Sequence, residues 1–320
     1  MDNLPATSSL APLQNNTFRA IWIASIVSNF GGMIQAVGAG WMMTSLSDSA
    51  NLVALVQAST TLPVMVFSLI SGASADGFDR RRIMLLAQFF MISASACLAV
   101  FAWLDLLTPW VLLGFTFLIG CGIAFNNPAS QAAVGDIVPR EEVPAAVLLN
   151  SVGFNVTRSI APAIGGVIVA IAGAAAAFVI NTLTYIGLIV VLWRWQPNLP
   201  ARTLPREPLL SAITTGMRYI AMSPNIAKVM LRGFIFGLTA IVVLALLPLV
   251  ARDLIQGGAQ TFGVLLGAFG VGAVGGAMIS RPARERFENE ILVRLAFIAL
   301  AGCAAVTALS TSIWLTGIGL

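Results

Sequence analysis

The stretch from Gly72 to Met84 reads Gly-Ala-Ser-Ala-Asp-Gly-Phe-Asp-Arg-Arg-Arg-Ile-Met and joins two long apolar runs. Each run is long enough to cross a bilayer, which takes about 20 apolar residues in a helix. Asp76 lies where the first run ends, and three consecutive arginines, Arg80 to Arg82, fill a connection too short to form a domain. The stretch therefore predicts a charged connection between two membrane helices, held close to the membrane surface.

The composition of the whole chain is that of a membrane protein. Hydrophobic residues make up 58% of the 320 residues and charged residues 9%, and the mean hydropathy is +0.92. A soluble domain of this size cannot bury so much apolar surface, so the chain must use lipid as its solvent. Because unpaired backbone groups are costly in lipid, each run should be helical throughout. We therefore expect an all-α polytopic membrane helix bundle.

The apolar runs give the domain organisation. Helices are predicted at residues 18–46, 52–75, 83–104, 110–134, 145–172, 174–193, 227–250, 262–279 and 291–309, and residues 314–320 open a tenth. We divide the chain into a cytoplasmic tail (1–17), an N-terminal six-helix half (18–193), a cytoplasmic linker (194–226) and a partial C-terminal half (227–320).

Within the linker, apolar residues recur at helical spacing from Leu209 to Ala221, opposite Ser211, Thr214 and Arg218. This pattern predicts an amphipathic helix, which either lies on the membrane face or packs on the bundle as an ordinary linker helix. A weak internal repeat supports the two halves: residues 272–286 resemble residues 68–82 at a displacement of 204 residues (272 − 68). Transporters built from two parallel halves leave such a trace.

The basic residues give the orientation. Fourteen of the 17 Lys and Arg residues fall at one face of the predicted helices, only Arg252 falls at the other, and Arg158 and Arg232 lie within helices. By the positive-inside rule, the amino terminus and the charged connection are cytoplasmic. We therefore expect a multi-pass membrane protein with a cytoplasmic amino terminus, in which the net charge of +4 reports topology and not nucleic-acid binding; the resemblance described below implies the bacterial inner membrane as its location.

Several kinds of chemistry are missing from the sequence. There is no histidine, which excludes a histidine proton relay or histidine metal site in these residues. Cys97, Cys121 and Cys303 lie in apolar runs far apart, so we expect free thiols. No Walker-type loop, HExxH-like motif or intramembrane pair of carboxylates occurs. We expect no enzyme activity, no metal, no cofactor and no direct use of ATP.

The stretch from Gly72 to Met84 resembles the loop between helices 2 and 3 of the major facilitator superfamily, whose pattern runs Gly-x-Leu-Ala-Asp-Arg-x-Gly-Arg-Arg. The matching positions are Gly72, Ala75, Asp76, Arg80 and Arg81, and the departures are Ser74, Gly77 and Asp79. Residues 41–62 and 149–166 are similar to a bacterial exporter branch of the superfamily, the transmembrane secretion effectors. The resemblance runs from about residue 15 to the last residue.

The resemblance implies two pseudo-symmetric six-helix halves that rock about a midplane site. It implies a monomeric secondary transporter, an antiporter driven by protons or another coupling ion, that exports a small molecule such as a siderophore or a drug. In the family the loop motif is assigned to latching the outward-open state. The conformational gate would then comprise Gly72, Asp76, Arg80, Arg81 and Arg82. The alternative is that the arginines only enforce topology and bind anionic lipid.

A second motif lies in the run at 145–172. Ala161-Pro162-Ala163-Ile164-Gly165-Gly166 resembles the antiporter motif Gly-Pro-x-x-Gly-Gly of exporters in the superfamily. Pro162, Gly165 and Gly166 match, and Ala161 replaces the first glycine. The likeness implies export. The alternative is a helix-packing face, since small residues let helices approach closely.

Arg158 lies about 13 residues into the same run, or roughly 20 Å along a helix. A charge at that depth is costly unless it faces a water-filled cavity or a partner. We expect Arg158 to face a central cavity and to attract an anionic part of the substrate; the alternative is an arginine bonded to carbonyls or to Asn155. Further cavity candidates, each alternatively an interhelical hydrogen bond, are Asn29, Gln35, Gln57, Asn126, Asn127 and Asn155.

No predicted helix centre contains Asp or Glu, although proton-coupled antiport usually relies on a titrating carboxylate. We expect that carboxylate in helices beyond Leu320, where the chain stops in an opening helix and leaves the second half incomplete. The basic motif of the superfamily's helix 4 is also absent. The alternative to a transporter is a truncated, transport-inactive remnant or an interaction partner in the membrane.

Overall fold

The computed structural model describes residues 10–197 and 209–320, and in these ranges the regular elements are all helices. Eight spans are long and apolar enough to cross a membrane. They are formed by α1 (Asn16–Leu46), α2 (Ala50–Gly77), α3 (Arg80–Trp103), α4 (Pro109–Ile137), α5 (Val143–Arg194), α7 (Pro224–Leu249) with the π-helical turn η2 (Val250–Leu254), α8 (Ala259–Arg286) and α9 (Asn289–Leu309). The shorter elements are η1 (Ala11–Gln14), α6 (Leu209–Ala221) and α10 (Ile313–Gly319).

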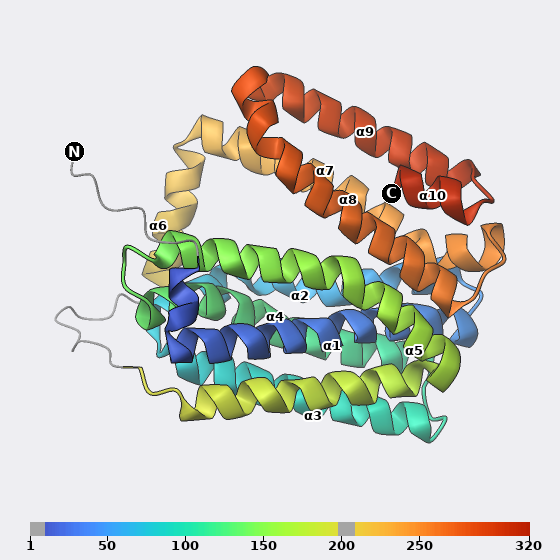
Figure 1. Cartoon of the computed structure of the whole chain (residues 1–320), viewed down its shortest axis with the longest axis horizontal. Coiled ribbons are helices and arrows are strands. Elements are labelled where there is room, and N and C mark those ends of the chain that lie inside the picture. The colour runs from blue at the N-terminus through green and yellow to red at the C-terminus, as the bar shows by residue number, and fades with distance from the viewer. Residues whose placement is uncertain (1–9, 198–208) are drawn as a thin grey trace.

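The long element α5 contains two of the predicted helices. Its backbone is non-helical at Gly173, where φ is 79° and ψ is 169°. Glycine adopts a positive φ without the steric penalty that a Cβ brings. The chain turns back at this point, so that the predicted helices at 145–172 and 174–193 are the two limbs of α5 (Figure 1).

The predicted helices are confirmed, and most extend beyond the apolar run by a few residues. The largest extension is in α8, predicted at 262–279 and observed at Ala259–Arg286. An apolar run measures only the hydrocarbon core, whereas a helix can continue among charged residues outside it. The predicted linker helix is α6; residues 198–208 of the linker and 1–9 of the tail lie outside the described residues.

The helices α1 to α5 form a bundle, and α7, α8 and α9 lie along one side of it (Figure 1). The bundle core contains Val37, Met43, Leu98, Leu112 and Phe178, all fully buried. In α7, η2 and α8, the buried hydrophobic residues run only from Ala245 to Leu265. The first four turns of α7, in contrast, are largely exposed. The two groups of helices therefore meet near one end and part toward the other.

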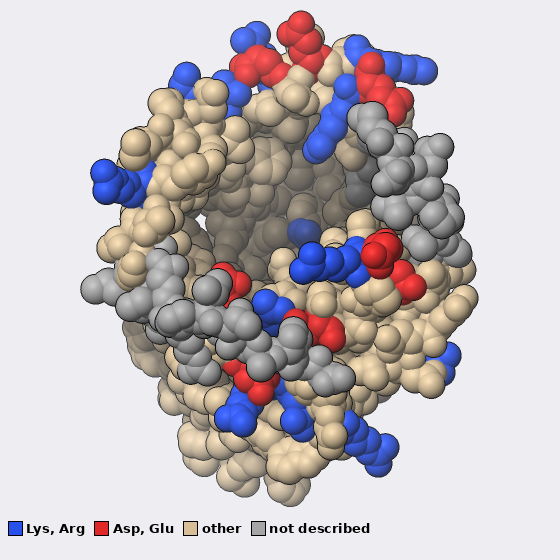
Figure 2. Space-filling model, turned by 90° about the vertical axis from the view of Figure 1, so that its left-hand side faces the viewer, with Lys and Arg blue, Asp and Glu red and all other residues tan. Residues whose placement is uncertain are grey.

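The two ends of the molecule differ in charge. One end, here called the Arg-rich end, carries the connection between α2 and α3, the connection between α4 and α5, and Arg194. The opposite end carries the connection between α1 and α2, the turn at Gly173, and η2. Figure 2 faces the Arg-rich end and shows a hollow between the helices, with mostly uncharged walls and charged side chains at its rim. The hollow opens at the Arg-rich end.

Candidate functional site

Arg80 joins three helices at the Arg-rich end. Its Nη1 donates to Oδ1 of Asp136 at 2.7 Å and to the carbonyl oxygen of Ala132 at 3.1 Å, both in α4. Its Nε donates to the carbonyl oxygen of Ala75 in α2 at 3.2 Å. The side chain of Asp136 is only 11% exposed and that of Arg80 27%, so this charge-assisted bond is partly shielded from water. Arg80 thus fixes the start of α3 between the ends of α2 and α4.

Arg81 reaches in another direction, to the end of α5. Its Nε donates to the carbonyl oxygen of Leu192 at 2.8 Å, and its Nη2 to that of Trp193 at 2.6 Å. The last carbonyls of a helix have no partner within the helix and carry the negative end of its dipole. Arg81 therefore caps α5 while it holds α3 against it.

The other members of the predicted gate are more exposed. Arg82 has a side chain 81% exposed and pairs with Asp79 at 3.3 Å. Asp79 itself caps α3, accepting from the backbone N–H of Arg81 at 3.0 Å. Asp76 lies exposed in the last turn of α2, and a Cβ added at Gly72 would meet open space. The structure therefore separates a fixed pair, Arg80 and Arg81, from the exposed Asp76 and Arg82, and Gly72 is partly buried.

Sequence reasoning missed Asp136 as the partner of Arg80. The residue lies in the connection predicted after the helix at 110–134, and its pairing with Arg80 joins positions 56 residues apart. The available signal was a carboxylate at the same membrane face as the arginines. That signal is shared by several other acidic residues, so it could not single out Asp136.

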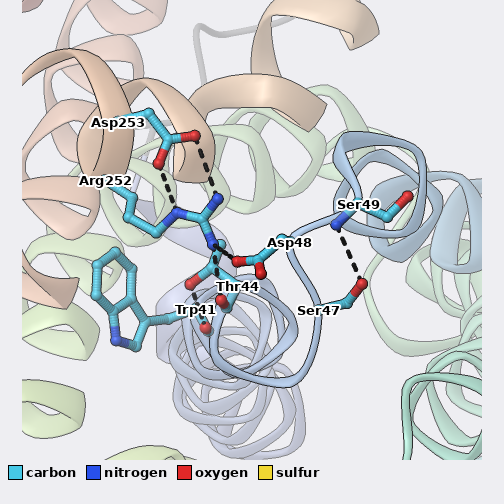
Figure 3. Close-up of polar contacts among 7 residues, drawn as sticks. All are labelled: Trp41, Thr44, Ser47, Asp48, Ser49, Arg252 and Asp253. Carbon is cyan, nitrogen blue, oxygen red and sulfur yellow. Dashed lines mark hydrogen bonds and ion pairs between the residues drawn. The ribbon is translucent and has the colours of Figure 1, made fainter.

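At the opposite end, Arg252 in η2 contacts α1 (Figure 3). Its Nη1 donates to the carbonyl oxygen of Thr44 at 2.8 Å and lies 3.5 Å from Oδ1 of Asp48. Asp253 orients the guanidinium through two bonds, from Nε to Oδ1 at 2.6 Å and from Nη2 to Oδ2 at 3.2 Å. Thr44 lies in the last turn of α1, where carbonyls lack helical partners. Arg252 thus bridges the bundle and the α7–α8 segment.

The helices α5 and α8 also cross closely near this end. A Cβ added at Gly263 would lie 2.6 Å from the carbonyl oxygen of Pro162 and 2.7 Å from the Cα of Gly166. A Cβ added at Gly166 would lie 2.8 Å from the carbonyl oxygen of Ala259. Because these neighbours are backbone atoms, glycine is required at the crossing. Gly165 faces α1 instead, where an added Cβ would lie 3.1 Å from the Cα of Ile34.

Arg158 lies where α5 and α8 begin to part. A Cβ added at Gly270 would overlap the carbonyl oxygen of Arg158, but one added at Gly275, further along α8, would meet nothing within 4 Å. The guanidinium carbon of Arg158 lies 4.8 Å from the centre of the Phe269 ring. In the part of the chain that the structure describes, the guanidinium has no hydrogen bond or ion pair.

The alternative expectation was a bond between Arg158 and Asn155, but the amide of Asn155 donates to the carbonyl oxygen of Ser151 at 2.9 Å. The contact that the structure shows for the Arg158 guanidinium is the one with the Phe269 ring. A cation over an aromatic face is stabilised by about 0.5–2 kcal/mol. An arginine at the centre of a membrane helix costs about 2.5–3.5 kcal/mol on insertion scales. The ring alone therefore offsets only part of the cost of placing this charge inside the bilayer.

The amide candidates occupy different surroundings. Gln35 is buried, and its Oε1 accepts from Ser95 Oγ at 2.8 Å and from Asn181 Nδ2 at 2.5 Å. Gln35 was predicted either to line a cavity or to make a hydrogen bond between helices. The structure shows the second, with bonds that join α1, α3 and α5. Asn126 accepts from buried Gln88 at 3.1 Å, between α3 and α4. The rest are partly buried or exposed side chains: Asn29, Gln57, Asn127 and Asn155.

No metal site is evident: within residues 10–197 and 209–320, no three Cys, Asp or Glu side chains come together as possible ligands. The described carboxylates lie at or near helix ends and in connections. Cys97, Cys121 and Cys303 are free thiols. The polar groups within the membrane spans are therefore mainly amides, hydroxyls and arginines.

The chain is similar in sequence to several proteins that are named as transporters or exporters. The chain is 23% identical over 262 residues to the staphyloferrin A transporter of Staphylococcus aureus, covering 78% of this chain and 63% of that protein. It is 24% identical over 269 residues to macrolide efflux protein A of Streptococcus pyogenes (79% and 66%) and 28% identical over 270 residues to the enterobactin exporter EntS of Shigella boydii (82% and 62%). The match spans somewhat less than two thirds of each of these relatives.

Solved structures show the same fold. A bacterial homolog to the human lysosomal transporter Spinster, in an inward-facing and unoccupied conformation, superposes with a TM-score of 0.68 at 17% identity, covering 97% of this chain and 72% of that one. The POT family transporter PepTSo superposes with a TM-score of 0.53 at 19% identity, covering 91% and 59%. The family model for the transmembrane secretion effector matches residues 7–320. This multi-pass membrane protein therefore belongs to the transmembrane secretion effector family of the major facilitator superfamily.

Proposed function

We propose that this chain belongs to a secondary active transporter that exports a small molecule, such as a siderophore or a drug, by alternating access. The observation that carries the proposal is the hollow, which opens at the Arg-rich end (Figure 2), while contacts between α1 and η2 and between α5 and α8 join the two groups of helices at the opposite end. These contacts are the bond from Arg252 to Thr44 and the glycine crossing of α5 and α8. A site open on one side only is what alternating access requires.

The proposed halves follow from the same geometry. Helices α1 to α5 form the N-terminal half (18–193), residues 194–226 form the linker, and α7 to α10 belong to the second half (227–320). By the positive-inside rule, the Arg-rich end and the amino terminus face the cytoplasm of a bacterial inner membrane. The hollow would then accept substrate from the cytoplasm, which is the loading step of an exporter.

The two ends would alternate in the transport cycle. When the hollow closes at the Arg-rich end, the exposed Asp76 and Arg82 of the α2–α3 connection would meet the end of α8. Arg80 and Arg81 would keep the ends of α2, α4 and α5 together as one rigid face. At the opposite end, the contact of Arg252 with Thr44 would have to break.

The names of the relatives support the proposed substrate. The relatives are a staphyloferrin A transporter, a macrolide efflux protein and an enterobactin exporter, so we propose a siderophore or a macrolide-like drug as the cargo. We propose antiport with protons by a monomer. Within residues 10–197 and 209–320, the helix centres contain no Asp or Glu that could carry the proton.

The test is transport by the full-length protein in everted membrane vesicles with an acidic interior. Radiolabelled enterobactin, staphyloferrin A and erythromycin serve as the panel, and vesicles from cells with an empty vector serve as the control. The proposal predicts accumulation of at least one compound that stops when nigericin collapses the pH gradient. Equal accumulation in both vesicle preparations for the whole panel would contradict it.

A further inference from the structure

The feature that the transporter fold alone does not explain is the charge of Arg158 beside the crossing of α5 and α8. We propose that Arg158 and Phe269 form a binding site for the anionic group of the cargo, a carboxylate or a comparable organic anion. This inference rests on the proposed function, because it names the class of substrate that the hollow accepts. It assigns the charge to Arg158 of α5 and the apolar platform to Phe269 of α8.

The position of Arg158 suits a binding site. It lies 15 residues after the start of α5 at Val143 and 15 residues before the turn at Gly173 (158 − 143 and 173 − 158), midway through the first limb. Along α8, Gly270 is the last glycine whose added Cβ would contact α5, and the contact is with the backbone of Arg158 and Ser159. Arg158 therefore lies at the edge of the crossing, and the proposal places the inner end of the hollow there.

The chemistry of the pair leaves the guanidinium free to bind. A guanidinium carries five N–H donors at its edge and no acceptor. The guanidinium carbon lies over the Phe269 ring at 4.8 Å, and the ring accepts no conventional hydrogen bond from the N–H groups. Since no described residue accepts from them, an incoming carboxylate can take two of these bonds in the paired geometry that arginine favours.

The charges around the hollow support selection of anions. Its walls are mostly uncharged, and charged side chains gather at the rim (Figure 2). The other arginine within a predicted helix, Arg232, is already paired with Glu290 at 2.6 Å, and Glu290 also lies 3.5 Å from Arg294. In a cleft with walls of low dielectric, an uncompensated charge raises the local concentration of its counter-ion. Arg158 supplies such a charge, whereas Arg232 does not.

The test measures the local preference for anions without knowledge of the cargo. In full-length protein with Cys97, Cys121 and Cys303 replaced by serine, Asn155→Cys places a thiol one helical turn from Arg158. The probes are two methanethiosulfonates of similar size, the anionic ethylsulfonate and the cationic ethyltrimethylammonium, applied to everted vesicles. The measured quantity is the rate at which the anionic reagent modifies the introduced thiol divided by the rate for the cationic reagent. This ratio is then divided by the same ratio for a small thiol in solution.

We expect the normalised ratio to favour the anionic reagent and to fall on the order of tenfold when Arg158→Gln is added. The matched control is Arg232→Gln, which removes another helical arginine and should leave the ratio unchanged. A ratio insensitive to Arg158→Gln would overturn the proposal. Failure of both reagents to reach the thiol introduced by Asn155→Cys in the open protein would overturn it too, because the hollow would then not extend to Arg158.

A second measurement links the site to transport. With a transported carboxylate and its methyl ester, Arg158→Gln should lower transport of the anion on the order of tenfold and leave the ester within about twofold. An equal loss for both compounds would assign Arg158 a purely structural role. If no compound is transported but the reagent ratio still depends on Arg158, the transport proposal fails and the anion site stands.

Discussion

Arginines hold both ends of this molecule, but they join different parts of it. At the Arg-rich end, Arg80 and Arg81 bind α2, α4 and α5, which all belong to the bundle that contains α3. At the opposite end, Arg252 joins the α7–α8 segment to α1. The first set of contacts can persist while the two groups of helices move, whereas the second would have to break in the proposed transport cycle. The partner of an arginine, and not the number of arginines, therefore indicates which contact is a gate.

The largest effect is expected from Arg80→Ala, which removes the partner of Asp136 and leaves a carboxylate that is only 11% exposed. Loss of one partner of a partly shielded pair should lower the free energy of unfolding by roughly 2–3 kcal/mol. Thermal unfolding in detergent would measure it. Arg82→Ala is the control, because a side chain 81% exposed should contribute no more than about 0.5 kcal/mol. Equal losses in the two variants would remove the distinction between fixed and exposed arginines.

The glycine crossing gives the next effect, through steric overlap. Gly263→Ala places a methyl group 2.6 Å from the carbonyl oxygen of Pro162, so α5 and α8 must separate. We expect a loss of roughly 1–3 kcal/mol in stability, the usual effect of overpacking. Gly275→Ala, in the same helix but in open space, should be neutral or stabilise by up to about 1 kcal/mol. Melting temperatures that fall equally would show that the crossing is not close-packed.

The gate at the opposite end should respond to Arg252→Ala by a change in conformation more than in stability. Loss of the bond to Thr44 should favour opening at this end by about 1 kcal/mol, which corresponds to about a fivefold shift in population. Double electron–electron resonance across this end measures the shift. Asp48→Asn serves as the control, since Asp48 is fully exposed and 3.5 Å from the guanidinium. Identical distance distributions in wild type and Arg252→Ala would exclude Arg252 as a gate.

Asp76→Asn should have the smallest effect on stability, within about 0.5 kcal/mol, because the carboxylate lies exposed at the end of α2. If Asp76 stabilises closure of the Arg-rich end, transport should slow by roughly two- to fivefold, the equivalent of an exposed ion pair. Initial rates in everted vesicles measure this change. Transport at the wild-type rate would exclude Asp76 from the closure of the Arg-rich end.

The membrane spans could be predicted from the sequence because each depends on a local property, the length of an apolar run. Even the division of α5 was visible, since Gly173 stands between two runs that are each long enough to cross the membrane. The end of α8 could not be predicted in the same way, because its last turns carry charges outside the hydrocarbon core.

The partners of the polar residues could not be read from the sequence, because each pairing depends on tertiary packing. The sequence showed that Arg252 lies at the membrane face opposite to most basic residues. It could not show the contact with Thr44, which lies 208 residues away in the chain. Gln35 looked like a cavity residue, and its partner Asn181 is 146 residues away. The depth of Arg158 was a local property and was predictable, whereas its contact with Phe269 was not.

Alternating access is tested most directly by a pair of distances across the two ends of the full-length, cysteine-free protein, measured by double electron–electron resonance. One pair of spin labels, at Ser49 and Gln260, spans the opposite end; the other, at Glu141 and Glu288, spans the hollow at the Arg-rich end, and all four positions are exposed. With a transported substrate and a proton gradient, we expect a longer distance at the opposite end and a shorter one at the Arg-rich end. Two distances that stay constant, or that change in the same direction, would contradict alternating access.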